Sequence, residues 1–412
     1  MRILRKPLNI LCAMAFIVLG GGVNADDDRL TGDWGGSRSR MEASGATFAG
    51  AFKTDIFSMD GGIQDDKAAM YHTELGVEFD LEALAGLTGW SAFIDVIDDR
   101  GDTINEDSLG SLLGVSNIEV YPGATRIDHA WIQKTSEDGR LAVLLGLYPV
   151  DSEFSAMDTA GMFSNAAFGP PADLSLTDTP SIFPTSAFGM RVIGLSADET
   201  GYVMAAILDG VAGDPDDAKK TTIDINSDDG AFGIIEFGLT PAREDEGPSK
   251  FAIGVWGYSQ DGDEVKPTQE GEMPDQGARW GAYVLADQRL WVSDLGTSLD
   301  AFARLSVADK STTALKGSFS AGVAVNGPLR GRPDDILGVA YTRGDLSHDY
   351  QNALEAEGVD PASYEDTWEI GYRAQINGWL VLQPLVQLVH NPAADKSIDD
   401  ATILGARVEI NF

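Results

Sequence analysis

The sequence predicts an all-β protein: a transmembrane antiparallel β-barrel of about 16 strands, preceded by a short helical segment. Segments of about ten residues alternate apolar and polar side chains, as strands do between lipid and a polar interior. The connections between them are long and short in turn, as in barrels with long outer loops and short periplasmic turns. After residue 25, no apolar run reaches the length of about 18 residues that a membrane helix needs.

Residues 1–25 are predicted to be a cleaved signal peptide. A basic stretch ending at Lys6 precedes an apolar core at 8–19 and the small-residue cleavage pattern at 23–25. The core of about 12 residues is too short for a membrane anchor, which needs about 20. We therefore expect export, with the mature chain starting at Asp26.

Composition excludes several classes of partner and site. The chain has 29 Lys and Arg against 65 Asp and Glu, a formal net charge of −36, which would repel the phosphates of a nucleic acid. Its one cysteine, Cys12, lies in the predicted signal peptide, and the four histidines are scattered. We expect no nucleic-acid partner, no cofactor and no zinc or thiol site.

The segment 26–45 is predicted to lie on the periplasmic side, before a barrel that spans 46–412. Residues 33–45 favour a short helix, with Asp33 or Ser37 as its N-cap and Gly45 at its end.

The clearest alternating segment is 71–81, where Leu75 and Val77 share one face and Glu74 and Glu78 share the other. The same reading along the chain predicts 16 strands, at 46–57, 70–81, 89–98, 126–134, 140–148, 186–195, 201–208, 231–239, 250–259, 279–290, 298–307, 317–326, 335–343, 366–376, 379–390 and 402–412. An even number returns both chain ends to the periplasmic side. One of the short connections, Asn377-Gly378, is a typical two-residue hairpin turn.

Tryptophans gather near the predicted strand ends, where aromatic rings form the interfacial girdles of membrane barrels. These are Trp90, Trp280, Trp291, Trp368 and Trp379. Trp131 and Trp256 fall inside strands, and the sequence leaves open whether they face lipid or the lumen.

The last predicted strand alternates from Thr402 and stops on Phe412, with Arg407 and Glu409 on its polar face. A chain that stops on an apolar residue of the outward face is typical of the closing strand of an outer-membrane barrel. We expect the barrel-assembly machinery to recognise this strand.

Five blocks of sequence give the chain a family resemblance. The first is Leu30-Thr31-Gly32-Asp33-Trp34-Gly35-Gly36-Ser37-Arg38, followed by Arg40, Glu42 and Gly45, and the others lie at 145–154, 163–170, 183–191 and 382–412. Together they resemble the carbohydrate-selective porins of the OprB family, although residues 209–365 match only in architecture. The resemblance implies a channel in the outer membrane of a Gram-negative bacterium. It would let small sugars diffuse passively into the periplasm through a polar, water-filled lumen.

The longest connection, 149–185, is rich in Phe and Pro, and a solvated outer loop would gain little from so many aromatic rings. We expect it to fold inward and narrow the channel, with the rings of Phe154, Phe163 and Phe168 available to stack on sugars. Packing outside against a neighbouring subunit is the alternative, and monomer and homotrimer both stay open.

The predicted lumen faces and strand entries supply charged candidates for solute contact. They are Glu74, Glu78, Arg191, Arg304, Glu369, Arg373, Arg407 and Glu409. Each of these residues, taken alone, could also be an ordinary solvated residue of the lumen wall.

Acidic pairs such as Asp216-Asp217 and Asp228-Asp229 distinguish the connections of this chain. They either hydrate the surface or bind divalent cations between the protein and lipopolysaccharide. The acidic composition puts anionic sugar acids in doubt and favours neutral sugars or cations. The alternative function is therefore a general or cation-preferring porin. An enzyme on a barrel is not expected, because no local Ser-His arrangement offers a nucleophile, and we assign no catalytic residue.

Overall fold

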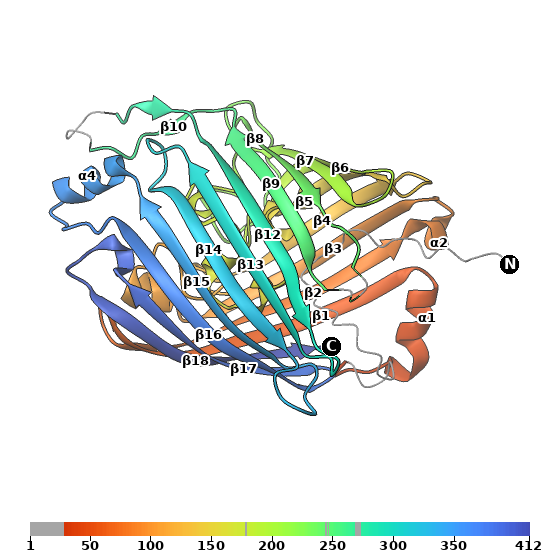
Figure 1. Cartoon of the computed structure of the whole chain (residues 1–412). Helices are drawn as coiled ribbons and strands as arrows, with labels where there is room; N and C mark the ends of the chain where they lie inside the picture. Colours follow the sequence, from red (N-terminus) through yellow and green to blue (C-terminus); the bar gives the residue numbers. More distant parts are fainter. Residues whose placement is uncertain (1–28, 178, 244, 246, 268–272) are drawn as a thin grey trace.

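A computed structural model describes residues 29–412, except for 178, 244, 246 and 268–272. The predicted signal peptide lies outside the described residues. The described chain forms a closed antiparallel barrel in which each strand pairs with its sequence neighbour and the first pairs with the last (Figure 1). The predicted fold class and each of the 16 predicted strands are confirmed.

The barrel strands are β1 (Ala46–Gly62), β2 (Asp66–Asp80), β3 (Trp90–Gly101), β4 (Thr125–Thr135), β5 (Leu141–Tyr148), β6 (Ala187–Leu195), β7 (Gly201–Asp209), β8 (Ala231–Leu239), β9 (Ser249–Tyr258), β12 (Trp280–Val292), β13 (Ser298–Ala308), β14 (Leu315–Asn326), β15 (Ile336–Leu346), β16 (Tyr364–Asn377), β17 (Leu380–His390) and β18 (Asp399–Asn411). Two short strands, β10 (Gly262–Asp263) and β11 (Gln276–Gly277), pair with each other in the connection after β9.

Helices occupy the ends and connections. They are α1 (Ser37–Ala43), α2 (Leu81–Ala85), α3 (Ala172–Ser175) and α4 (His348–Ala356), with single turns at Trp34–Gly36, Asn105–Leu109, Val150–Ser152, Ala160–Met162, Ala166–Phe168 and Pro392–Ala394. Among the helices of the described residues, none has the length and apolar content needed to cross a membrane.

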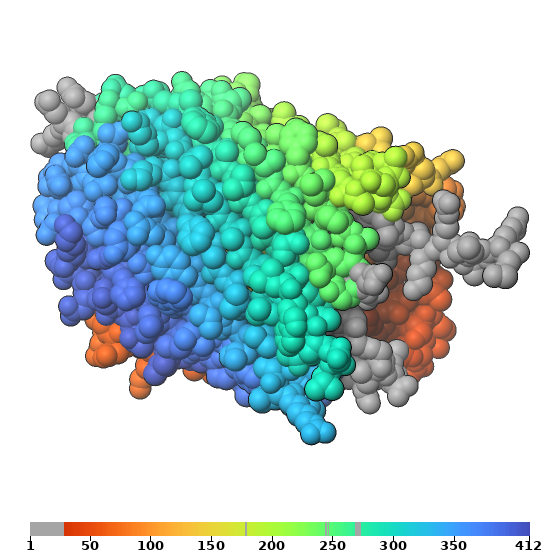
Figure 2. All heavy atoms as spheres, in the orientation of Figure 1, coloured from red at the N-terminus to blue at the C-terminus, as the bar shows by residue number. Residues whose placement is uncertain are grey.

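The two faces of the barrel follow from the period-2 alternation of each strand. On β13, Arg304 is 2% exposed and points inward, whereas its neighbour Leu305 is 53% exposed and points outward. Paired positions continue this apolar outer row across six strands, through Val203, Phe237, Ile253, Val284, Leu305 and Phe319. Figure 2 shows that the side chains of β12 to β17 form an unbroken outer surface. Exposed apolar rows of this kind are suited to lipid.

Tryptophans mark both ends of the outer wall. Trp280 is the first residue of β12 and Trp291 lies near the end of the same strand, and both are about half exposed. Trp131 and Trp256, which the sequence left open, are 6% and 2% exposed and belong to the buried interior cluster.

The N-terminal helix lies at the seam where the barrel closes. β1 pairs with β18 from Ala51 opposite Asn411 to Gly62 opposite Asp399. Arg38 of α1 is buried there and donates through Nη2 to the carbonyl of Phe48 at 2.8 Å and that of Phe412 at 3.3 Å. The N-cap of α1 is Gly36 and not the predicted Asp33 or Ser37, although the side chain of Asp33 accepts the backbone N–H of Ser39 in the first turn at 2.8 Å.

Replacing Leu404 with lysine tests the outer face. Leu404 is 58% exposed near the middle of β18, so a cation there is expected to destabilise the barrel in lipid by about 2–4 kcal/mol. Denaturant unfolding in vesicles measures the loss. Leu295→Lys is the control: Leu295 is 95% exposed in the turn after β12, and its replacement should cost little. Equal losses in the two variants would contradict a lipid-facing Leu404.

Candidate functional site

Two connections contribute buried side chains to the interior of the barrel, and we call them the inner connections. The first covers 102–124, after β3, and the second covers 149–186, after β5. Ile104 and Leu109 in the first are fully buried, and Phe163 in the second is 1% exposed. Both connections pack against inward side chains of strands that lie far from them in the sequence.

Carboxylates on the strands hold the second inner connection by accepting its backbone N–H groups. Glu236 of β8 accepts from Ser155 at 2.8 Å, and Asp287 of β12 accepts from Thr159 at 3.0 Å. Glu369 of β16 accepts from two successive amides, those of Ser164 at 2.8 Å and Asn165 at 2.9 Å. These three acids are at most 2% exposed, so their charge-assisted hydrogen bonds to the connection are shielded from solvent.

Arginines make the complementary contacts. Arg304 of β13 donates through Nη2 to the carbonyls of Ala167 and Pro170, each at 3.0 Å, and through Nη1 to the carbonyl of Gly169. Arg191 of β6 donates through Nε to Glu153 of the connection at 2.8 Å. The predicted lumen residues Arg191, Arg304 and Glu369 therefore face inward and fix the second inner connection.

A buried ion pair at the seam holds the first inner connection. Asp55 of β1 accepts two hydrogen bonds of 2.7 Å from Arg407 of β18, and one of 2.6 Å from the hydroxyl of Ser116. Arg407 also donates to the side chain of Asn117 at 2.7 Å. Arg407 thus joins the first strand, the last strand and the connection.

The aromatic rings predicted to stack on solutes are covered by protein. Phe154, Phe163 and Phe168 are 2%, 1% and 3% exposed. The ring centres of Phe163 and Phe168 lie 5.1 Å apart, and both rings contact Phe302 of β13. In this structure they anchor the connection and leave no ring face open to the lumen.

A row of charged side chains crosses the interior beside the inner connections. Its cross-strand neighbours are Asp99 on β3, His72 on β2, Lys53 on β1 and Glu409 on β18. Arg373 of β16 donates to Glu409 at 2.8 Å. We call this row, together with Glu74 of β2, the charged belt: Lys53, His72, Glu74, Asp99, Arg373 and Glu409.

The side chains of the belt differ in their solvent exposure. The side chains of Glu74 and Glu409 are 20% and 13% exposed, and Lys53 is also half-buried. His72 is buried, with its Nδ1 2.8 Å from Asp99 and its Nε2 3.8 Å from Glu74. Each acid of the belt therefore lies near a basic side chain, and the belt mixes both signs of charge over a short distance.

Three predicted residues, Glu74, Arg373 and Glu409, fall in the belt, and Glu78 is exposed near the end of β2. Sequence reasoning did not select Lys53, His72 or Asp99. The sequence could have indicated His72, because it lies on the same polar face of β2 as Glu74. Lys53 gave a weaker signal, because the inner face of β1 also carries Ala51, Phe57 and Met59.

One group of side chains has the donor set of a metal site. Asp95 of β3 and Asp128 and His129 of β4 place one ligand atom each within 4.8 Å of one another. A β-bulge in the β3–β4 pairing sets two residues opposite Asp95. Its carboxylate accepts the backbone N–H of His129 at 2.6 Å, and the imidazole Nδ1 lies 3.1 Å from Asp95 and from Asp128. The imidazole thus bridges the two acids directly.

The first inner connection carries a titratable carboxyl, Glu119. It accepts the backbone N–H of Asn105 at 2.7 Å, while its second oxygen is buried without a partner among the described residues. Burial, with a smaller contribution from the nearby carboxylates of Asp107 and Glu106, raises the pKa of Glu119 from 4.5 to about 7.

Protonation of Glu119 should therefore stabilise the folded state. Because its folded-state pKa lies above the unfolded value, the contribution of Glu119 to stability is fully present below pH 4.5 and is lost as the pH rises towards 7. Glu119→Gln should flatten this part of the stability curve, since the amide keeps the acceptor for Asn105 and carries no charge. Denaturant unfolding between pH 4 and 8 gives the measurement. An unchanged pH profile in the variant would contradict the assignment.

Known proteins resemble the chain over its length. Residues 65–412 match the family model described as carbohydrate-selective porin, OprB family. Porin B of Pseudomonas aeruginosa is 23% identical, covering 99% of this chain and 98% of the relative. The putative porin QuiX of Acinetobacter baylyi is also 23% identical, over 94% of each protein.

Solved structures agree with the fold. The high-pH structure of Pseudomonas putida OprB superposes with a TM-score of 0.85 at 20% identity, covering 94% of this chain and 99% of that one. An anion-selective porin from Comamonas acidovorans superposes with a TM-score of 0.51 at 11% identity, covering 89% of this chain and 99% of that one. The chain belongs to the OprB family of carbohydrate-selective porins.

Proposed function

We propose that the chain lets small neutral sugars diffuse passively across the outer membrane into the periplasm, along the charged belt. The observation that carries the proposal is the mixture of charge in the belt. Lys53 and Arg373 are interleaved with Glu74, Asp99 and Glu409, so hydrogen-bond donors and acceptors alternate along one strip of the interior. Sugars present hydroxyl groups that both donate and accept hydrogen bonds, and this pattern suits them.

Physical chemistry favours weak contacts of this kind in a channel. Each contact must be favourable enough to admit the solute and weak enough to release it. Belt side chains that already bond to one another, as Arg373 does to Glu409, have fewer donors and acceptors left for a sugar, so each contact with the sugar is weak. A wall of a single sign would instead concentrate counterions.

The second inner connection is proposed to set the width of the channel. Its bonds to Glu236, Asp287, Arg304 and Glu369 hold it against strands β8 to β16. Fixed in this way, it restricts solutes to the part of the interior that the belt lines. Phe154, Phe163 and Phe168 then contribute by holding the connection in place.

Cation-preferring conduction is the second candidate. The belt has three carboxylates against two permanently charged cations, and the whole chain carries −36. Such a channel would pass potassium faster than chloride and show no preference among neutral solutes of one size.

Lys53→Glu is the variant that tests the belt. Losing the donor and adding a fourth carboxylate is expected to slow glucose entry about fivefold, the worth of one net hydrogen bond of about 1 kcal/mol. It should also increase the preference for cations. Swelling of proteoliposomes in glucose, in amino acids of similar size and in larger sugars provides the rates. Lys67→Glu, at an exposed position on β2, is the matched control.

The outcomes separate the candidates. Faster entry of glucose than of a similar amino acid, lost in Lys53→Glu and kept in the control, supports the sugar channel. Equal entry of both solutes into vesicles that hold folded wild-type protein would leave the cation-preferring porin. Chemical turnover of the sugar would contradict a channel without catalytic residues.

The proposed partners of the barrel, besides sugars, are outer-membrane lipid and the barrel-assembly machinery. Outer-membrane lipid would cover the apolar outer rows, and the barrel-assembly machinery would engage β18, which runs up to Phe412. A homotrimer stays a prediction, to which no surface is assigned.

A further inference from the structure

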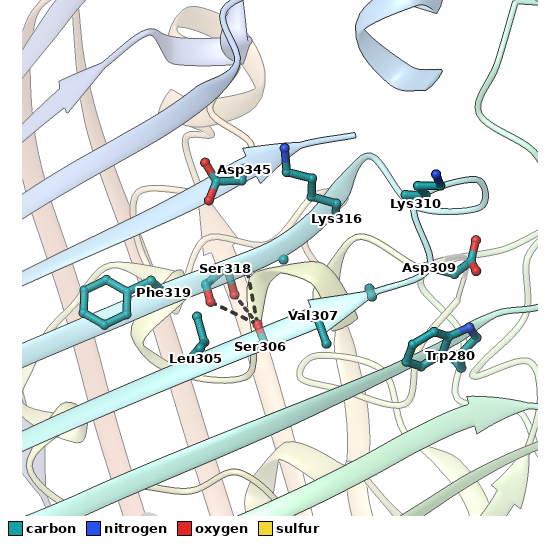
Figure 3. A pocket seen from close by; sticks show the side chains of 12 residues that line it. Trp280, Leu305, Ser306, Val307, Asp309, Lys310, Lys316, Ser318, Phe319 and Asp345 are labelled. Carbon is teal, nitrogen blue, oxygen red and sulfur yellow. Dashed lines mark hydrogen bonds between the residues drawn. The ribbon is translucent and has the colours of Figure 1, made fainter. Parts of the chain in front are cut away.

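A groove lies on the outer wall of the barrel, where β12, β13 and β14 reach the connection at 309–314 (Figure 3). Its volume is about 560 Å³. One side is apolar: Leu305, Phe319 and Trp280 are 53%, 39% and 45% exposed. On the other side, Lys310 and Lys316 stand at the edge of the connection. The groove therefore joins an apolar strip of the wall to a pair of ammonium groups.

Local backbone geometry makes this arrangement. The pairing of β14 with β15 shifts between Leu315 and Gly317, so Lys316 sits at a β-bulge, and its side chain is exposed. Gly317 leaves the adjoining part of the groove open. A Cβ atom there would lie 2.5 Å from the carbonyl oxygen of Ser306, so this close approach of two strands excludes a larger residue.

The charges at this edge favour an anion. Neither Lys310 nor Lys316 forms an ion pair with any other residue that the structure describes. The two acids of the groove are already engaged. Asp345 accepts from Arg343 at 2.7 Å, and Asp309 accepts from the backbone and hydroxyl of Ser311 at 2.9 and 2.6 Å. In a chain with a net charge of −36, the ammonium groups of these two lysines remain available to an anionic ligand.

The position of the groove relative to the membrane indicates which kind of anion it would bind. The even-numbered barrel places the 309–314 connection at the end opposite the two chain termini, which is the outer-leaflet side of an outer membrane. A ligand that reaches both sides of the groove needs acyl chains for the wall and a phosphate at the level where lipid meets water. Phosphorylated glycolipids of the outer leaflet, the lipid A class, combine the two.

We propose that this groove binds one lipid A molecule, with a phosphate between Lys310 and Lys316 and an acyl chain along Leu305 and Phe319. Trp280 closes the groove at the interface, where its ring packs beside the lipid and its polar edge remains near water. The site lies on the outside of the barrel, so it does not depend on which solute the channel conducts.

Binding to the folded, detergent-solubilised protein tests the proposal. The probes are bisphosphorylated lipid A, its water-soluble phosphorylated disaccharide without acyl chains, and phosphatidylglycerol, each titrated by native mass spectrometry. Wild type should bind lipid A at least tenfold more tightly than either of the other probes. The double variant Lys310→Ala/Lys316→Ala should lose about tenfold in affinity for lipid A, because each lysine near a lipid surface contributes to anion binding.

A second lysine pair supplies the control. Lys219 and Lys220 are exposed in the connection after β7, outside this groove, and Lys220 already bonds to Asp214 at 2.9 Å. Lys219→Ala/Lys220→Ala should bind lipid A as wild type does. Equal losses in both double variants, or none in the Lys310/Lys316 variant, would overturn the site. Equally tight phosphatidylglycerol binding by wild type would overturn the choice of lipid A. Heat-modifiable gel mobility verifies that each variant is folded, and the single variant Lys310→Gln serves if the double variant is not.

Discussion

Replacing Arg304 with alanine is expected to release the second inner connection and widen the channel. Arg304 is 2% exposed, and its guanidinium binds one short stretch of that connection through the carbonyls of Ala167, Gly169 and Pro170. A hydrogen bond to a charged group contributes about 1.5–3 kcal/mol, so loss of three of them removes much of the free energy that docks the connection. Single-channel conductance should rise, and the difference between glucose and larger sugars in proteoliposome swelling should shrink.

Arg343→Ala controls for removal of an arginine from another barrel strand. Arg343 of β15 pairs with Asp345, and both side chains are more than one third exposed, so its loss should leave conductance unchanged. Arg304→Lys keeps the charge without the planar fork and should give an intermediate conductance. A folded Arg304→Ala barrel with wild-type conductance and sugar discrimination would show that the connection is held without this residue.

Asp55→Ala is expected to cause the largest loss of stability. It removes the partner of Arg407 and leaves a buried guanidinium uncompensated at the seam of β1 and β18. Breaking a buried ion pair in this way costs about 3–5 kcal/mol. The denaturant midpoint in vesicles should fall accordingly, and the bond to Ser116 that holds the first inner connection is lost as well.

Two further variants show whether the cost comes from the unpaired charge. Asp60→Ala removes an exposed carboxylate from the same strand and should be nearly neutral. Asp55→Ala/Arg407→Leu removes both charges and should recover part of the stability, because an apolar pair avoids the desolvation penalty. A double variant no more stable than Asp55→Ala would argue that the seam depends on the bonds themselves.

The strands were predictable because their signal is local. A side chain of β13 faces lipid or the interior according to its parity in the sequence, so Arg304 and Leu305 could be assigned from the residue order alone. Strand ends were less accurate. β1 was predicted to end at residue 57 but continues to Gly62, because pairing with β2 extends to Met59 and pairing with β18 extends to Gly62. Helix α4, whose N-cap Ser347 accepts the N–H of Tyr350, lies in a connection where no helix was predicted.

The candidate site was harder to predict, because it depends on contacts between distant parts of the chain. Glu369 and Glu409 look alike in the sequence, each on the polar face of a C-terminal strand. In the fold, Glu369 is fully buried under Ser164 and Asn165, whereas Glu409 remains 13% exposed beside Arg373. No pattern within either strand records which inner connection will cover it. The aromatic residues of 149–185 pose the same problem, since burial against the wall and contact with a solute favour the same residue types.

Pairing of β1 with β18 also constrains how the molecule is made. Every strand between them can pair with its sequence neighbour as soon as that neighbour emerges. The edge of β1 that faces away from β2 stays unpaired until the last strand is available. Contacts between such distant segments form slowly, because the intervening chain must first be ordered. An open strand edge is also a template for pairing with another chain, and in lipid its unsatisfied N–H and C=O groups are costly. The time between synthesis of β1 and arrival of β18 is therefore the period in which the nascent protein is most exposed to aggregation and proteolysis, and a helper that covers this edge would be needed for the whole of it.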